Sequence, residues 1–220
     1  MSLFVTFEGP DGSGKTTQMQ LLADWLRGRG FDVLTTREPG GTSIGDQIRA
    51  ILHYPKNADM RPATEALLFS ASRAQIVDQV IRPALRRGQI VLCDRYADST
   101  MAYQGYGHGL DLDALRTITA FATEGLTPDL TIYLDLDVEE GLRRKRAAYE
   151  AGQSEWTRMD QMEVEFHRRV REGYLRMAAA EPERWLVLDA RRPIEEVQAL
   201  IRAKVEEKLT ERLPRAEAQG

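Results

Sequence analysis

Residues 3–17 read LFVTFEGPDGSGKTT, and this stretch decides the fold. The apolar residues Leu3–Phe7 predict a buried strand, and Gln18–Trp25 continue the chain with helical spacing. Between them, Gly9–Thr16 matches the pattern G-x-x-x-x-G-K-[ST], in the order of strand, loop and helix that this motif requires. The stretch therefore predicts a loop that binds phosphate, rather than a glycine-rich turn that matches by chance.

The chemistry of phosphate binding explains why each of these residue types stands in the loop. Glycines let backbone N–H groups wrap around a phosphate, and the helix N-terminus adds a favourable dipole. Lys15 is expected to reach the β- and γ-phosphates of a bound nucleotide, and the Thr16 hydroxyl to ligate Mg²⁺. Asp94 ends an apolar strand and is the second expected metal ligand; otherwise it is a strand-end turn residue. The expected ATP-binding residues of the loop are Gly9, Pro10, Asp11, Gly12, Ser13, Gly14, Lys15, Thr16 and Thr17.

Four more apolar runs predict strands along the chain. They are Asp32–Thr36, Gln89–Cys93, Leu130–Leu134 and Trp185–Leu188, and segments with helical periodicity separate them. Apolar strands that alternate with helices indicate an α/β fold in which helices cover both faces of a parallel sheet. No linker rich in Gly, Ser or Pro divides the chain, so we expect a single domain over residues 1–220, with a frayed tail at 211–220.

The composition excludes several classes of protein. The net charge of −4 gives no overall attraction for nucleic acid. Cys93 is the only cysteine, which excludes an intrachain disulfide or a site with several thiolates and fits a reducing compartment. The N-terminus lacks the apolar core of a signal peptide, and no apolar run is long enough to cross a bilayer. We therefore expect a cytoplasmic protein without nucleic-acid or membrane partners.

Phosphate-binding loops occur in switches, motors and kinases, so the class needs its own argument. A GTPase switch is expected to show D-x-x-G after the metal-binding strand, but Asp94–Ala97 reads DRYA. It also needs N-K-x-D to bind guanine, whereas Lys56–Asp59 reads KNAD. The sequence therefore argues against a GTPase switch.

The acceptor of a kinase determines which side chains it needs. A kinase that acts on a free hydroxyl wants a general base, whereas one that acts on a monophosphate needs cations to hold two polyanions in line. This chain offers four arginines at suitable places, Arg37, Arg49, Arg73 and Arg95. A nucleoside monophosphate kinase is favoured; the alternatives are another nucleotide or deoxynucleoside kinase and a non-catalytic nucleotide-binding regulator.

Arg73 falls on the apolar side of a predicted helix. It follows Phe69 by four residues, so the two side chains lie roughly 40° apart around the helix axis. A guanidinium on such a face needs a partner or a wet cleft. One interpretation is an internal ion pair or a side chain that extends to the surface; the other is a ring and a set of donors directed at one base.

Several short blocks resemble the thymidylate kinase family, and they follow the family order from about residue 5 to residue 195. The blocks are Thr36–Thr42 (TREPGGT), Phe69 with Arg73, Asp94–Tyr96 (DRY), Ala102–Gly105 (AYQG) and Asp189–Pro193 (DARRP). The resemblance implies a P-loop NTPase three-layer sandwich with a five-stranded parallel sheet. It also implies ATP as donor, Mg²⁺ as cofactor, dTMP as acceptor, dTDP as a product used for dTTP synthesis, and a homodimer packed through helices.

The resemblance also implies roles for single residues. Phe69 would stack on thymine, and Arg73 would donate to O4, where cytosine carries an amino group. Gln104 would lie near the base and Tyr103 near the sugar, while Asp11 would meet the 3′-hydroxyl. Arg37, Arg49 and Arg95 would clamp the acceptor phosphate, and Arg191 would lie beside adenine. The expected substrate-binding residues are Asp11, Arg37, Arg49, Phe69, Arg73, Arg95, Thr100, Tyr103 and Gln104.

One difference between this chain and part of the family bears on which residues supply the positive charge for catalysis. Members of the eukaryotic type resemble this chain but have an arginine in the loop where this chain has Gly12, whereas bacterial-type members carry catalytic arginines in a mobile lid. The charge of the transition state needs a cation, so the lid is its expected source. Residues 141–158 are the lid candidate, although Ala148 stands where the family places a basic residue.

The basic residues of this segment also have a simpler explanation. Arg143 and Arg144 each follow a glutamate by four residues, so both are also explained as surface ion pairs. Arg146 and Arg158 do not fit that explanation as readily, and they rank before Arg143 as catalytic candidates. The expected catalytic residues are Lys15, Arg95, Arg146, Arg158 and Arg143.

Overall fold

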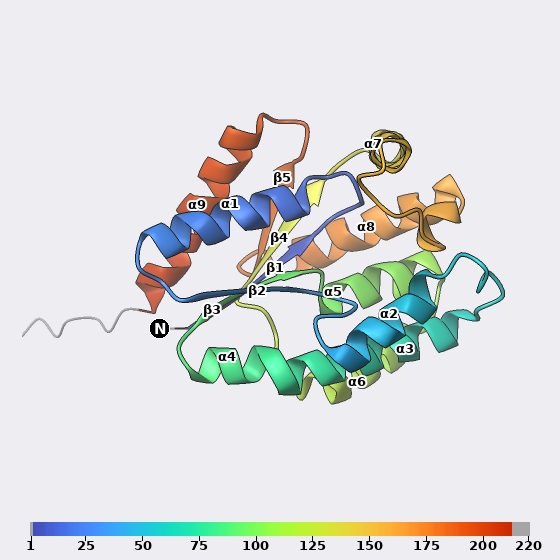
Figure 1. The fold of residues 1–220 in the computed structure, drawn as a ribbon, viewed down its shortest axis with the longest axis horizontal. Coiled ribbons are helices and arrows are strands. Elements are labelled where there is room, and N and C mark those ends of the chain that lie inside the picture. The colour runs from blue at the N-terminus through green and yellow to red at the C-terminus, as the bar shows by residue number, and fades with distance from the viewer. Residues whose placement is uncertain (1, 213–220) are drawn as a thin grey trace, which may run out of the picture.

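The computed structural model describes residues 2–212, and its centre is one parallel sheet of five strands (Figure 1). The strands are β1 (Leu3–Glu8), β2 (Val33–Arg37), β3 (Ile90–Asp94), β4 (Leu130–Asp135) and β5 (Trp185–Asp189). They lie in the order β2-β3-β1-β4-β5, and every neighbouring pair is parallel. The predicted α/β fold with five parallel strands is confirmed, and each strand agrees with its predicted range to within one residue at either end.

Helices cover both faces of this sheet. They are α1 (Lys15–Gly28), α2 (Ser43–His53), α3 (Pro62–Ile76), α4 (Arg82–Arg86), α5 (Ala97–Thr100), α6 (Leu112–Thr123), α7 (Val138–Glu150), α8 (Val164–Ala180) and α9 (Ile194–Glu211). Two π-helical segments, η1 (Val77–Ile81) and η2 (Met101–Gly107), and one 3₁₀ turn, η3 (Met159–Gln161), complete the described elements. Of the described helices, none is both long and apolar enough to span a bilayer.

The core follows from the alternation of side chains along the buried strands. Leu3, Val5 and Phe7 of β1 pack into the cluster that also contains residues of α1 and α9. Phe4 points the other way, into the cluster formed with η1 and β3. Figure 1 shows the corresponding layers, with α1 and α9 on one face of the sheet and α3 and α4 on the other.

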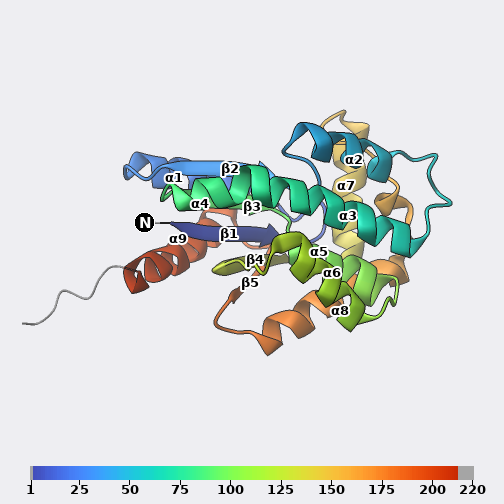
Figure 2. The same ribbon diagram turned by 90° about the horizontal axis from the view of Figure 1, so that it is seen from below.

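The register of the sheet brings the carboxyl ends of β1, β2 and β3 to one edge. Phe7 of β1 pairs with Asp94, and Arg37 of β2 pairs with the same aspartate. The phosphate-binding loop follows β1, between β3 and β4, at the point where the strand order changes direction. Ligands of open α/β sheets bind in the crevice outside such an edge. Figure 2 shows α2, α7 and α8 lying beyond this edge.

The lid candidate, residues 141–158, consists of most of α7 and the loop that follows it. Asp137 caps the start of α7 by accepting hydrogen bonds from the backbone N–H groups of Glu139 and Glu140. At the other end of the chain, α9 still includes Glu211, so the helix reaches one residue into the predicted tail. Residues 213–220 of that tail lie outside the described residues.

Candidate active site

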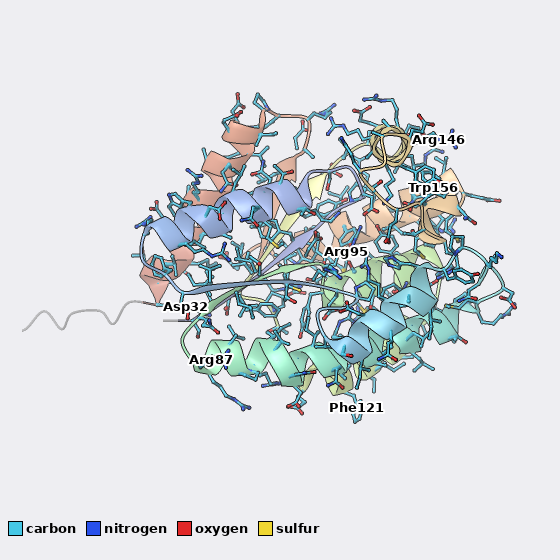
Figure 3. All side chains as sticks on the ribbon, viewed as in Figure 1. Asp32, Arg87, Arg95, Phe121, Arg146 and Trp156 are labelled. Carbon is cyan, nitrogen blue, oxygen red and sulfur yellow. The ribbon has the colours of Figure 1, made fainter. Side chains whose placement is uncertain are left out.

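A cleft of about 810 Å³ opens at the carboxyl edge of the sheet. Figure 3 shows Arg95 near the middle of the molecule, whereas Arg146 and Trp156 lie toward the outside beside α7. The cleft brings together side chains that are far apart in the sequence. The predicted site residues that line it are Pro10, Asp11, Gly12, Gly14, Lys15, Thr16, Thr17, Arg37, Arg49, Phe69, Asp94, Arg95, Thr100, Tyr103 and Gln104.

The glycines of the loop are required by its backbone path. Gly9 has φ +139°, and a Cβ there would lie 2.6 Å from the Leu134 carbonyl oxygen. Lys15 is buried and donates hydrogen bonds to the carbonyl oxygens of Gly9 and Pro10, both at 3.0 Å. The hydroxyl of Ser13 is buried and finds no partner within residues 2–212. The loop thus holds an ammonium group and unused polar atoms around the space where the motif predicts phosphates.

Thr16 and Asp94 form the predicted metal pair. The Thr16 hydroxyl donates to Asp94 Oδ2 at 3.0 Å, across from α1 to the end of β3. Both side chains offer oxygen ligands, which Mg²⁺ prefers, and this ion usually takes only one or two protein ligands beside water and phosphate oxygens. Nowhere in the described part of the chain do three or more metal-ligating side chains gather. The pair fits an ion that arrives with nucleotide rather than one held by a complete protein cage.

Three cations surround the carboxylate of Asp11. Arg95 Nη2 lies 2.8 Å from Oδ1, Lys15 Nζ lies 3.7 Å from Oδ1, and Lys145 Nζ lies 3.0 Å from Oδ2. Burial favours the neutral acid, but the charges of Lys15, Arg95 and Lys145 together hold the pKa of Asp11 well below its usual range. The group is therefore an anion at neutral pH, and it keeps three cations close to the phosphate-binding loop.

The three arginines of the expected phosphate clamp all line the cleft. Arg37 pairs with Asp46 at 3.3 Å, and Arg49 donates to the Pro39 carbonyl oxygen at 3.2 Å. Burial and then the charge of Arg37 lower the pKa of Arg49. Because the guanidinium groups of Arg37 and Arg49 repel each other in the lining of the cleft, together they attract an anion. Arg95, the third member of the clamp, has φ +68°, a left-handed conformation that is uncommon for a residue with a side chain.

The other end of the cleft carries an aromatic ring and an amide. Phe69 is half-buried on α3, and Gln104 and Tyr103 lie on η2. Arg95 lies over the ring of Tyr103, with its guanidinium carbon 5.2 Å from the ring centroid. The structure thus brings together the residues for which the resemblance implies contacts with base and sugar.

The Arg73 side chain is buried among protein groups, at the residue for which the resemblance implies a contact with thymine. It is 1% exposed and does not belong to the described lining of the cleft. Its guanidinium donates to Glu38 Oε2 at 2.8 Å, to the Thr100 hydroxyl at 2.9 Å and to the Tyr96 carbonyl oxygen at 3.1 Å. The internal ion pair, one of the two interpretations of the sequence, is therefore present. Three of the five guanidinium N–H groups are used in this way, and two remain.

The three lid arginines that the sequence nominates as catalytic do not line the cleft among the described residues. Arg143 pairs with Glu140 at 2.7 Å on the outside of α7. Arg146 lies over the ring of Trp156, 5.7 Å from its centroid. Arg158 is 5% exposed and forms an ion pair with the buried Glu65. Helical spacing explains the first two positions, since α7 directs other residues inward: Val138, Gly141, Leu142, Lys145 and Ala148.

The lid helix instead brings Lys145 into the cleft and packs directly on the loop. A Cβ at Gly12 would lie 2.8 Å from Arg144 Cβ and 3.1 Å from the Gly141 carbonyl oxygen. The place of a side chain at position 12 is therefore taken by α7. Arg144 Nη1 lies 3.5 Å from the carbonyl oxygens of Gly12 and Ala190, which links the loop to the segment after β5. Sequence reasoning passed over Lys145 because it lies in a run of basic residues, and only the helix phase separates it from them.

Sequence reasoning also assigned no role to three buried carboxylates around the cleft, Glu8, Glu38 and Glu65. Glu8 accepts from the Tyr96 backbone N–H at 2.9 Å and from the hydroxyl groups of Ser99 and Tyr174. Burial raises the pKa of Glu8. It ties β1 to the segment after β3 directly behind Arg95.

Arg191, the expected neighbour of adenine, is exposed and pairs with Asp189 at 2.7 Å. It does not belong to the described lining of the cleft. The segment that carries it lies beside the loop, because Arg144 reaches Ala190, and Gln18 of α1 donates to the Ile194 carbonyl oxygen at 3.0 Å. The structure thus places Arg191 near the start of α1, at the rim of the site.

The family model described as "Thymidylate kinase" matches residues 7–201. A thymidylate kinase of Roseiflexus castenholzii is 56% identical, over 99% of this chain and 98% of the relative. One of Deinococcus radiodurans is 54% identical, over 94% of this chain and 97% of the relative.

A solved structure agrees with these sequences. The crystal structure of thymidylate kinase from Ehrlichia chaffeensis superposes with a TM-score of 0.74 at 34% identity, covering 93% of this chain and 98% of that one. The family model and the relatives extend over nearly the whole chain, including the phosphate-binding loop, the cleft and the lid helix. The chain therefore belongs to the thymidylate kinase family.

Proposed function

We propose that the protein transfers the γ-phosphoryl group of ATP to the phosphate of dTMP and so makes dTDP for dTTP synthesis. One observation carries the proposal: a single cleft joins a cationic phosphate-binding loop to an end with an aromatic ring and an amide. Phosphates occupy the first end and the thymine base the second. Membership of the family supports the same donor and acceptor.

The donor half of the site consists of the loop and the start of α1. Backbone N–H groups of Gly12–Thr17 cradle the phosphates of ATP, and Lys15 moves from the carbonyl oxygens of Gly9 and Pro10 to phosphate oxygens. Thr16 and Asp94 would hold Mg²⁺, which would neutralise part of the phosphate charge. Arg191 lies on the adenine side.

The acceptor half holds a dianionic phosphate in line with the donor. Arg37, Arg49 and Arg95 supply the cations, and Asp11 receives the 3′-hydroxyl of the sugar. Catalysis then consists mainly of positioning and of stabilising charge on the transferred group. Lys145 is the lid cation best placed for the second task, because it already lies inside the cleft.

Base recognition uses the far end of the cleft. Phe69 stacks on thymine, Gln104 faces its N3–H, Thr100 and Tyr103 close the pocket, and Arg73 directs one of its two remaining N–H groups at O4. The carbonyl at O4 accepts this hydrogen bond, whereas the amino group of cytosine would place a donor against a donor. The buried ion pair with Glu38 fixes the guanidinium for that contact.

The working form of the protein is a homodimer in the cytoplasm, the compartment in which Cys93 stays a free thiol. Phe121 on α6 is 86% exposed and Leu67 on α3 is 56% exposed, and these two helices pack against each other. Large exposed apolar side chains on adjoining helices favour burial against a second copy. The partners are thus ATP, dTMP and a second subunit, with no nucleic acid or membrane.

A coupled assay tests the proposal. Purified protein is given ATP and Mg²⁺ with dTMP, dUMP, dCMP, dAMP, dGMP or thymidine in parallel, and dTMP should be phosphorylated fastest. Brisk turnover of thymidine or of another monophosphate, with none of dTMP, contradicts the proposal, and nucleotide binding without turnover indicates a regulator. Lys15→Ala should lower kcat on the order of a hundredfold while the circular dichroism spectrum stays unchanged; near-normal turnover contradicts the role of the loop.

A further inference from the structure

A buried cluster lies directly behind the base end of the cleft. Glu65 of α3 is completely buried, and its carboxylate contacts three side chains from other parts of the chain. Oε1 accepts from Gln104 Nε2 at 2.6 Å and lies 3.3 Å from His108 Nε2, while Oε2 pairs with Arg158 at the end of the lid segment. Glu65 and Phe69 are four residues apart on α3, so they share one face of that helix.

The charge state of Glu65 follows from these contacts. Burial favours the neutral acid, but the nearby side chains of His108, Arg158 and Gln104 hold the pKa of Glu65 below its ordinary value. The group is therefore a carboxylate at neutral pH. An ionised carboxylate accepts hydrogen bonds and has none to donate.

This fixes the orientation of the Gln104 side chain. An amide has an NH₂ group on one side and a carbonyl oxygen on the other, and only the NH₂ group can face a carboxylate. Gln104 is 1% exposed and lines the cleft, so its carbonyl oxygen is the end left for the ligand. Within residues 2–212 no group donates a hydrogen bond to that oxygen. Glu65 thus determines that Gln104 presents a hydrogen-bond acceptor, its carbonyl oxygen, to the cleft.

We propose that Glu65 is a positioning residue for base selection, which acts through Gln104 and is itself held by Arg158. A thymine base carries a donor at N3, whereas cytosine carries an acceptor there. A carbonyl oxygen fixed in the pocket accepts a hydrogen bond from the N3–H of thymine and repels the N3 lone pair of cytosine. The inference rests on the proposed function, since it assigns the pyrimidine base to this end of the cleft.

The variant Glu65→Gln tests this by replacing one carboxylate oxygen with an NH₂ group. Arg158 has only donors, so the carbonyl oxygen of the introduced amide turns to Arg158 and its NH₂ group turns to Gln104. Gln104 then reverses and presents its own NH₂ group to the cleft. Isothermal titration should show a Kd for dTMP raised on the order of tenfold, and a ratio of the dCMP Kd to the dTMP Kd lowered by at least about the same factor. The Kd for ATP should change less than about twofold.

Two further variants separate this role from a merely structural one. Glu65→Gln combined with Arg158→Met removes the donor that orients the introduced amide, so part of the preference for dTMP should return. In a Gln104→Met background, Glu65→Gln should change the ratio of the two Kd values less than about twofold, because the amide that Glu65 orients is gone. Circular dichroism and a thermal melt of each variant show whether it is folded.

The result that overturns the inference is a folded Glu65→Gln protein with an unchanged ratio of the two Kd values. An equal change in the Gln104→Met background overturns it as well, since Glu65 would then act by another route. Both measurements are equilibrium titrations and need no turnover. Failure of the wild-type protein to make dTDP contradicts the proposed function, whereas an unchanged ratio contradicts only the role of Glu65.

Discussion

Lys145 Nζ of the lid helix lies 3.0 Å from Asp11 Oδ2 of the phosphate-binding loop. The same carboxylate pairs with Arg95 and lies 3.7 Å from Lys15, so cations from three separate elements converge on one anion. An incoming phosphate competes with Asp11 for these cations and finds them already assembled. Such preorganisation reduces the free energy needed to gather charge around the transferred group.

This arrangement predicts which basic residue of the lid matters. Lys145→Ala should lower kcat on the order of a hundredfold, because it removes the lid cation inside the cleft. Lys145→Arg should retain more activity than Lys145→Ala, because it keeps a positive charge at this position. Arg146→Ala should stay within about twofold of wild type, because Arg146 lies outside the cleft over Trp156. Steady-state kinetics with saturating ATP and dTMP decide the question, and a larger loss with Arg146→Ala would support the assignment made from the sequence.

The buried pair between Arg73 and Glu38 predicts that substitutions there can restore the stability of the protein without restoring its affinity for dTMP. Arg73→Met leaves Glu38 as an unpaired buried carboxylate, so the free energy of unfolding should fall by about 3 kcal/mol. Combining it with Glu38→Gln removes that charge and should recover most of the loss in urea denaturation. The double variant should still bind dTMP more weakly while its Kd for ATP changes little. If both substrates are affected equally, the role of Arg73 is structural.

His53 predicts a dependence of stability on pH. Burial and then the charge of Arg49 lower the pKa of His53 from 6.5 to about 4. Between these values the unfolded chain binds a proton that the folded chain does not, so stability falls as the pH is lowered through this window. The contribution is on the order of 1 kcal/mol per pH unit. Between pH 7 and pH 4.5, His53→Gln should therefore lose less unfolding free energy than wild type; equal losses would contradict the pKa assignment.

The exposed apolar side chain of Phe121 predicts the subunit interface. Figure 3 shows it at the outer edge of the molecule, pointing away from the core. Phe121→Asp should weaken dimerisation by at least about thirtyfold, because a charge would be buried in the interface. Leu200→Asp on α9 is the matched control, at a side chain that is 39% exposed. Light scattering across a dilution series measures the subunit mass; a dimer unchanged by Phe121→Asp places the interface elsewhere.

Much of the fold could be read from local patterns. The five strands were predicted to within one residue at each end, since short apolar runs between helical segments have few other structures available. The loop at Gly9–Thr16 was also predictable, because its glycines and Lys15 are close together in the sequence. The arginines that line the cleft, such as Arg49 and Arg95, could be proposed from the chemistry of a monophosphate acceptor.

The tertiary structure decided whether each charged side chain lies inside the cleft or outside it. Lys145 and Arg146 are neighbours in the sequence, yet the phase of α7 places one in the cleft and the other outside it. Arg158, which the sequence nominates for catalysis, pairs in the fold with Glu65 of a distant helix. The sequence alone determined the sheet, the phosphate-binding loop and the kinds of side chain available, because these depend on near neighbours. Tertiary packing decided which cations meet the ligand and which meet buried carboxylates, because that depends on partners many residues away.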